Sequence, residues 1–147
     1  MTVRVARATV ASRLMGAFVL VSALSVACGS PPQAQPWQVA FDDAEGWILS
    51  SDAVADVAII DGRLRIEIFQ PGQLAWATSE RTWEDFRASV EATQTAGPLD
   101  NEYGILVRMD DDRAFYAFSV SGDGYVRASR FEEGVWTVLG QDWTPSS

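Results

Sequence analysis

The side chain with the clearest chemistry in this sequence is the thiol of Cys28, the only cysteine in the chain. A lone thiol forms no intrachain disulfide, so its remaining chemistry is acylation, oxidation or metal binding. Cys28 directly follows an apolar run at residues 14–27, and that run follows three arginines. This position favours acylation at a membrane, because a basic stretch followed by a short apolar run is the layout of a secretory signal.

The end of the apolar run resembles the lipobox of bacterial lipoproteins. Residues 24–28 read Leu-Ser-Val-Ala-Cys, with the small Ala27 directly before the cysteine and Ser25 where a leucine is commonest. The run is too short to cross a bilayer, which takes about 20 apolar residues. The resemblance implies that residues 1–27 are a signal peptide and that Cys28 carries lipid, with acyl chains such as palmitate. The alternative is ordinary signal cleavage that leaves Cys28 as a free thiol.

A lipid on Cys28 predicts attachment to a membrane of the cell envelope, on its extracytoplasmic side. Two or more acyl chains anchor a protein stably, since each buried methylene contributes about 0.8 kcal/mol. Residues 28–36 are uncharged and hold three prolines, which predicts a flexible tether. Residues 37–147 then form one predicted domain with eight arginines and 20 acidic residues, a net charge of −12. This charge repels phosphates, so we expect no nucleic acid partner.

The composition excludes most kinds of catalytic and metal-binding site. The chain has no histidine, so neither a Ser-His nor a Cys-His nucleophile system can form. With its only thiol acylated, the chain lacks the usual zinc ligands, and we expect no metal and no cofactor. Carboxylates remain for acid–base catalysis, but the adjacent Glu84 and Asp85 would point to opposite faces of a strand. We therefore expect no catalytic residues, unless carboxylates face each other across a cleft.

Three further features each allow a binding role and a structural one. Asp110-Asp111-Asp112 offers oxygen ligands for calcium, although a solvated hairpin loop explains the run better. Arg87, Glu91, Glu102 and Arg108 suit either polar ligand contacts or cross-strand ion pairs. The tryptophans suit either stacking on sugar rings or filling of the core. They are Trp37, Trp47, Trp76, Trp83, Trp136 and Trp143.

The elements that must position these residues are strands, because period-2 alternation recurs along the domain. Residues 57–60 and 63–68 flank Asp61-Gly62, which predicts a two-residue hairpin because such a turn needs positive φ. A short strand is predicted over residues 74–79. A longer one is predicted over residues 85–95, and a helix over residues 82–90 is the weaker alternative.

Four more strands are predicted over residues 102–109, 114–120, 125–131 and 135–139. Their connectors are short and contain glycine or aspartate, as hairpin loops do. Strands at this spacing, without a convincing helix, indicate an all-β antiparallel sandwich.

Two of these strand regions carry a family resemblance. Residues 101–108 read Asn-Glu-Tyr-Gly-Ile-Leu-Val-Arg, and residues 115–125 read Phe-Tyr-Ala-Phe-Ser-Val-Ser-Gly-Asp-Gly-Tyr. They resemble concanavalin A-like (LamG-type) jelly-roll domains, above all those of bacterial lipoproteins and of 3-keto-disaccharide hydrolase-type domains. The resemblance implies a jelly-roll fold. Such domains continue past a Trp-Thr-Pro-Ser-like segment, whereas this sequence stops at Ser147, so we expect a partial sandwich with an uncovered face or edge.

These features together predict a lipid-anchored, non-catalytic binding module of the cell envelope. Its first candidate ligand is a carbohydrate, or else another envelope component. One alternative is a structural or protein-interaction lipoprotein with an envelope protein as partner. The other is a sugar-processing hydrolase of the 3-keto-disaccharide hydrolase type. The sequence does not assign ligand-binding residues.

Overall fold

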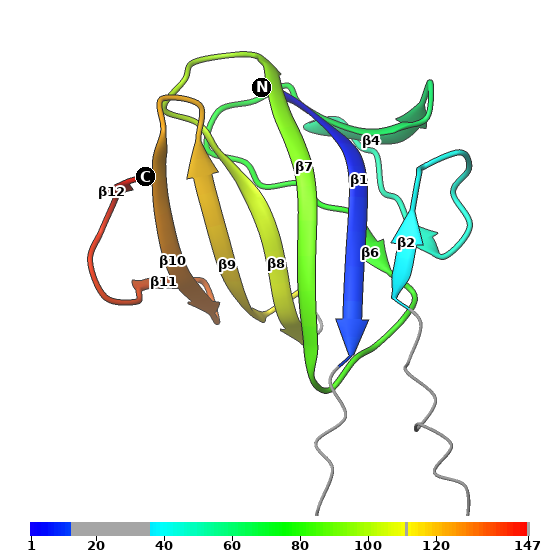
Figure 1. Cartoon of the computed structure of the whole chain (residues 1–147). Helices are drawn as coiled ribbons and strands as arrows, with labels where there is room; N and C mark the ends of the chain where they lie inside the picture. Colours follow the sequence, from blue (N-terminus) through cyan, green and yellow to red (C-terminus); the bar gives the residue numbers. More distant parts are fainter. Residues whose placement is uncertain (13–35, 111, 147) are drawn as a thin grey trace, which may run out of the picture.

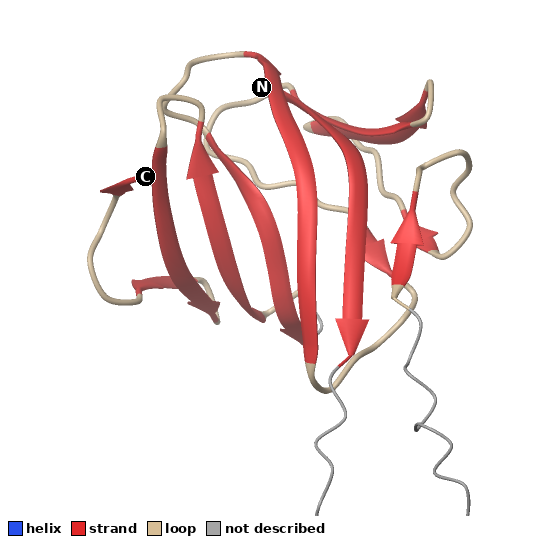
Figure 2. Cartoon of the chain, in the orientation of Figure 1, coloured by secondary structure: helices blue, strands red, loops and turns tan. Residues whose placement is uncertain are grey.

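The computed structural model describes residues 1–12, 36–110 and 112–146, and these form antiparallel strands joined by turns and loops (Figures 1 and 2). The strands are β1 (Thr2–Ser12), β2 (Trp37–Val39), β3 (Trp47–Ile48), β4 (Ala55–Ile60), β5 (Arg63–Ile68), β6 (Thr78–Ser79), β7 (Phe86–Ala96), β8 (Glu102–Asp110), β9 (Ala114–Ser121), β10 (Tyr125–Glu132), β11 (Val135–Val138) and β12 (Thr144–Pro145). The predicted all-β class is confirmed.

The first sheet contains β1, β2, β4, β5 and β7. Its β4–β5 hairpin confirms the prediction made from Asp61-Gly62, since both turn residues have positive φ, 53° and 67°. Val57 and Leu64, one on each strand of the hairpin, are almost completely buried. The hairpin thus presents one apolar face to the core, as its alternating sequence requires.

Strand β1 lies in the middle of this sheet, although its residues belong to the predicted signal peptide. Residues 2–5 pair with β5, residues 8–10 pair with β2, and almost the whole strand pairs with β7 along its other edge. Met1, which precedes β1, also bonds to the end of β5, since its amino group donates to the Ile68 carbonyl oxygen at 2.8 Å. Signal cleavage before Cys28 stays a prediction, and it would remove this strand from the sheet. Cys28 itself lies outside the described residues, as does most of the predicted tether.

The predicted strand over residues 74–79 is mostly wrong. Only Thr78 and Ser79 form a strand, β6, which pairs with β3 in a separate two-stranded sheet. The preceding residues are held by side-chain packing instead of ladder hydrogen bonds, because Ala75 and Ala77 pack on the core while Trp76 lies 6.5 Å from the Phe115 ring. By contrast, β7 confirms the longer strand and excludes the helix over residues 82–90.

The second sheet is the predicted meander, in the order β11-β10-β9-β8 with β12 added to β10. The four predicted strands are confirmed to within a residue or two at each end. Figure 1 shows β8, β9 and β10 side by side and β1 next to β7. No ladder hydrogen bonds join β7 to β8 within the described chain.

Two apolar clusters hold the structure together. One is built on Phe41, Val57 and Leu64, where the inner face of the first sheet meets β3 and β6. The other lies on the inner face of the second sheet, where Phe115 stacks on Phe131 at 5.0 Å between ring centroids. The result is an all-β sandwich, compatible with a jelly roll, in which aromatic rings contribute much of the buried area.

Candidate functional site

The structure separates the polar residues that the sequence suggested as one mixed face. Arg87 and Glu91 project from the solvent-facing side of β7. Arg108 lies with Glu84 and Asp85 along a crevice between β7 and β8. Glu102 is elsewhere, on the inner side of the second sheet, where it pairs with an arginine that the sequence analysis did not single out. The four residues therefore do not form one site.

The calcium alternative receives no support from the part of the aspartate run that is described. Asp111 lies outside the described residues, and Asp112 adopts a left-handed turn conformation with φ of 60°. Among the described residues, no group of three or more cysteine or acidic side chains is arranged to hold a metal ion.

Five of the six tryptophans divide into two groups by location. Trp37 packs against both Trp47 and Trp83 under the first sheet, with ring centroids 5.7 and 5.3 Å from its own. Trp136 and Trp143 instead line an open groove of about 750 Å³. Trp136 is exposed, whereas Trp143 and the three tryptophans of the first group are all half-buried.

We refer to this second location as the tryptophan groove. It lies between the loop that follows β5, the β7–β8 connection and the inner side of β10 and β11. Its polar lining consists of Gln70, Gln73, Asp100, Asn101, Glu102 and Arg127. A groove with aromatic faces and several amide and charged groups is suited to a ligand that is itself both polar and apolar.

Arg127 and Glu102 meet in the groove because of strand register. Glu102 on β8 lies opposite Ser121 of β9, and Arg127 on β10 lies opposite Ser119 of β9. Directly opposed residues share a face of the sheet, so the two long side chains extend across β9 over its two small serines. The Arg127 Nη2 donates to both carboxylate oxygens of Glu102 at 3.0 Å.

The Arg127 guanidinium is fixed from two further directions. It lies 4.4 Å from the centroid of the Trp143 ring, within range of a cation–π interaction. Its Nη1 is 3.6 Å from Asp142. These contacts also fix the position of Trp143 at one side of the groove.

Trp136 is positioned by the aromatic cluster beneath it. It lies opposite Phe131 in the β10–β11 ladder and makes an edge-to-face contact with Phe115 at 5.6 Å. With one part of the ring packed in this way, 46% of the residue is still exposed. The groove thus has one aromatic wall anchored in the core and another anchored by a cation.

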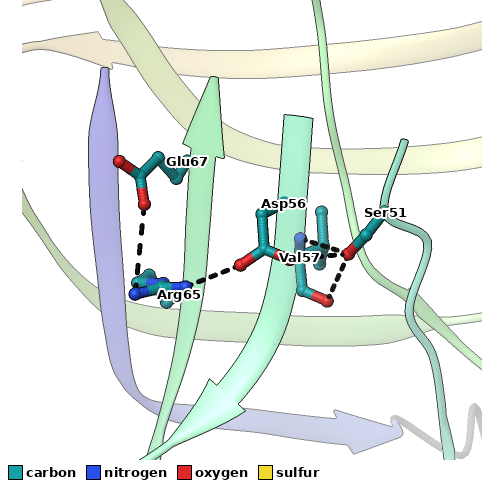
Figure 3. Close-up of polar contacts among 5 residues, drawn as sticks. All are labelled: Ser51, Asp56, Val57, Arg65 and Glu67. Carbon is teal, nitrogen blue, oxygen red and sulfur yellow. Dashed lines mark hydrogen bonds and ion pairs between the residues drawn. The ribbon is translucent and has the colours of Figure 1, made fainter. Parts of the chain in front are cut away.

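A second polar cluster, at the β4–β5 hairpin, has a structural role (Figure 3). The Arg65 Nη2 donates to Asp56 at 2.6 Å, and the Ser51 hydroxyl donates to the other Asp56 oxygen at 2.9 Å. These hydrogen bonds, that from Arg65 above all, hold the pKa of Asp56 below its usual value. The Ser51 oxygen also accepts from the Val57 amide at 3.0 Å, so the cluster fixes the segment before β4 to the hairpin.

Comparisons with models of protein families, with curated proteins and with solved structures found no match to this chain. Residues 1–12, 36–110 and 112–146 contain no helix with the length and apolar character needed to cross a bilayer. The case for the groove therefore comes from its geometry alone.

Only some of the groove residues were candidates from the sequence. Trp136, Trp143 and Glu102 were among its candidates, but Arg127 and the glutamines of the β5–β6 loop were not. The alternation Arg127, Ser129, Phe131 along β10 was a usable signal for the arginine, since it places Arg127 on the face that carries the aromatic cluster. The glutamines lie in a loop, where periodicity carries no information.

Proposed function

We propose that this protein is a lipid-anchored binding module of the cell envelope that recognises carbohydrate in the tryptophan groove. The observation that carries the proposal is the combination of two aromatic walls with amide, carboxylate and guanidinium groups in one groove of about 750 Å³. A sugar ring has apolar C–H faces that pack on aromatic rings and hydroxyls at its edge that need hydrogen-bond partners.

The charge balance within the groove favours an uncharged glycan. The Arg127 guanidinium is already paired with Glu102 and Asp142, and the other cation of the described lining, the Met1 amino group, donates to the Ile68 carbonyl oxygen. An anionic sugar would have to displace these carboxylates, whereas neutral hydroxyls can bond to Gln70, Gln73 and Asn101 without doing so.

The signal and family resemblances support the location and the fold class in this proposal. The lipobox-like residues before Cys28 favour attachment to a membrane, and the uncharged tether would hold the domain away from it. The concanavalin A-like resemblance of residues 101–125 favours a jelly-roll domain of the kind found in envelope lipoproteins. A fold resemblance alone does not assign a ligand, so the groove residues carry that part.

A glycan array followed by calorimetry tests the proposal. The full-length chain with Cys28→Ala, which stays unlipidated, and residues 28–147 with the same substitution, the form that signal cleavage would leave, should both bind one or more neutral oligosaccharides. Trp143→Leu should weaken that binding about two- to tenfold, the range for loss of one aromatic contact. Phe118→Leu is the matched control, because Phe118 is exposed on the opposite face of the second sheet. An array without binding, or equal weakening by both substitutions, would contradict the carbohydrate proposal.

A protein-interaction lipoprotein is the second candidate, and a different surface favours it. On the outer face of the second sheet, Phe118, Val120 and Val126 are 53%, 37% and 37% exposed and lie on adjacent strands. Contiguous apolar surface of this kind commonly marks a protein-binding site. Phe118→Ser with Val120→Ser should abolish binding of a purified envelope partner while leaving glycan binding unchanged, and the reverse result would refute this candidate.

A further inference from the structure

A second cavity lies inside the sandwich, away from the tryptophan groove. Its volume is about 220 Å³, and it lies between the inner face of the first sheet, the β3–β6 pair and the edge of β8. Trp37, Trp47, Trp76 and Trp83 line it together with aliphatic side chains such as Leu64 and Ile105. None of its described lining residues is charged, so it is unsuited to an ionic ligand.

One polar group at this cavity lacks a partner. The Trp47 Nε1 is buried, and its N–H finds no acceptor among the described residues. The ring packs against Trp37, with centroids 5.7 Å apart, and against Phe41, with centroids 5.4 Å apart. Indole nitrogens that are buried normally have a hydrogen-bond acceptor, and leaving one unpaired is destabilising.

The size of the cavity limits what it can hold. An apolar cavity of about 150 Å³ is large enough to bind benzene, so one of about 220 Å³ accommodates a benzene ring with a small substituent. Ligand sites for larger, drug-sized molecules start near 300 Å³.

The seam between β7 and β8 lies beside the cavity. These strands are not joined by ladder hydrogen bonds, and the surface crevice between them shares Ala88 and Ile105 with the cavity wall. Separation of the two strands at this point breaks no backbone pairing between them, so a small molecule can enter without disrupting either sheet.

We propose that this cavity is a binding site for a small uncharged molecule with an apolar body, about as large as a substituted benzene ring, and one hydrogen-bond acceptor. The apolar body packs against the tryptophan and aliphatic walls, and the Trp47 N–H donates a hydrogen bond to the acceptor. The inference is independent of carbohydrate binding in the groove.

A pair of probes of matched shape tests it. Acetophenone carries a carbonyl oxygen where α-methylstyrene carries a CH₂ group, so the two differ chiefly in the acceptor. In calorimetric titrations of the full-length Cys28→Ala chain, acetophenone should bind about two- to tenfold more tightly, the value of one net hydrogen bond. In ¹⁵N NMR spectra, acetophenone should shift the indole N–H resonance of Trp47 more than α-methylstyrene does.

Two substitutions complete the test. Trp47→Phe keeps an aromatic wall but removes the N–H, so it should reverse the preference in favour of α-methylstyrene, because the acetophenone carbonyl is then buried without a donor. Ala77→Leu fills part of the cavity and should abolish binding of both probes, which keeps the test decisive if Trp47→Phe does not fold. Absence of saturable binding to the unsubstituted cavity, equal affinity for the two probes, or undiminished binding by Ala77→Leu would each overturn the proposal.

Discussion

Two arginines, Arg65 and Arg127, each pair with carboxylates on a sheet, yet their surroundings give them different roles. Arg65 bonds to Asp56 across the β4–β5 hairpin (Figure 3). Arg127 pairs with Glu102 and also contacts Trp143 at the edge of a groove. An ion pair between two adjacent strands mainly supports the sheet, whereas one that also fixes a half-buried indole is suited to the binding surface that we propose.

The Asp56–Arg65 pair should make stability depend on pH. Because the pKa of Asp56 is lowered in the folded state from its ordinary 3.8, ionised Asp56 stabilises the fold above that value. This stabilisation is lost as the pH falls through the lower folded pKa. Asp56→Asn should therefore lower the free energy of unfolding at neutral pH, and the difference from the unsubstituted chain should shrink in acid.

Urea unfolding at neutral pH and in acid, well below the ordinary pKa of an aspartate, measures this effect. Glu67→Gln is a suitable control, since Glu67 lies 3.9 Å from Arg65 and is more exposed. A loss for Asp56→Asn that is equal at the two pH values would show that the carboxylate charge is not the cause.

Pairing of β8 with β9 requires a glycine at position 104. It lies opposite Ser119 in the β8–β9 ladder, and a Cβ added there would fall well inside van der Waals contact of the Phe118 carbonyl oxygen. Backbone cannot move away without breaking the ladder, so Gly104→Ala should lower the free energy of unfolding by more than about 2 kcal/mol.

The control for this prediction is Gly134→Ala in the β10–β11 turn. A Cβ at Gly134 meets no atom within 4 Å, but φ is 84°, so the loss should be about 1 kcal/mol from backbone strain alone. Equal losses for the two variants in urea unfolding would mean that contact with Phe118 is unimportant.

Strands were predictable where the sequence alternates and a turn residue sets the register. The β4–β5 hairpin and the β8–β11 meander meet both conditions, since glycines and aspartates occupy their turns. The segment around Trp76 alternates too, but it packs through side chains and has no neighbouring strand until Thr78. The tryptophan groove was less predictable, because residues from three loops and from four strands meet there only after the sheet has formed.

At the level of the whole molecule, the first sheet depends on β1. Comparison of the full-length Cys28→Ala chain with residues 28–147 measures that dependence. Removal of β1 separates β7 from β5 and β2, so the free energy of unfolding should fall by more than about 3 kcal/mol, beyond the range of most single substitutions. Coincident urea midpoints for the two proteins would show that the sheet forms equally well without β1.

Under the lipid anchoring that we propose, the central place of β1 makes folding and export compete for the same residues. A secretory signal must reach the translocation machinery as an accessible segment, whereas these residues bond to strands on both of their edges once the sheet has formed. Sheets with long-range pairing fold slowly, which gives export time to act first. The fraction of chains that become lipidated on Cys28 would then be set by two rates, that of translocation and that of closing the first sheet around β1.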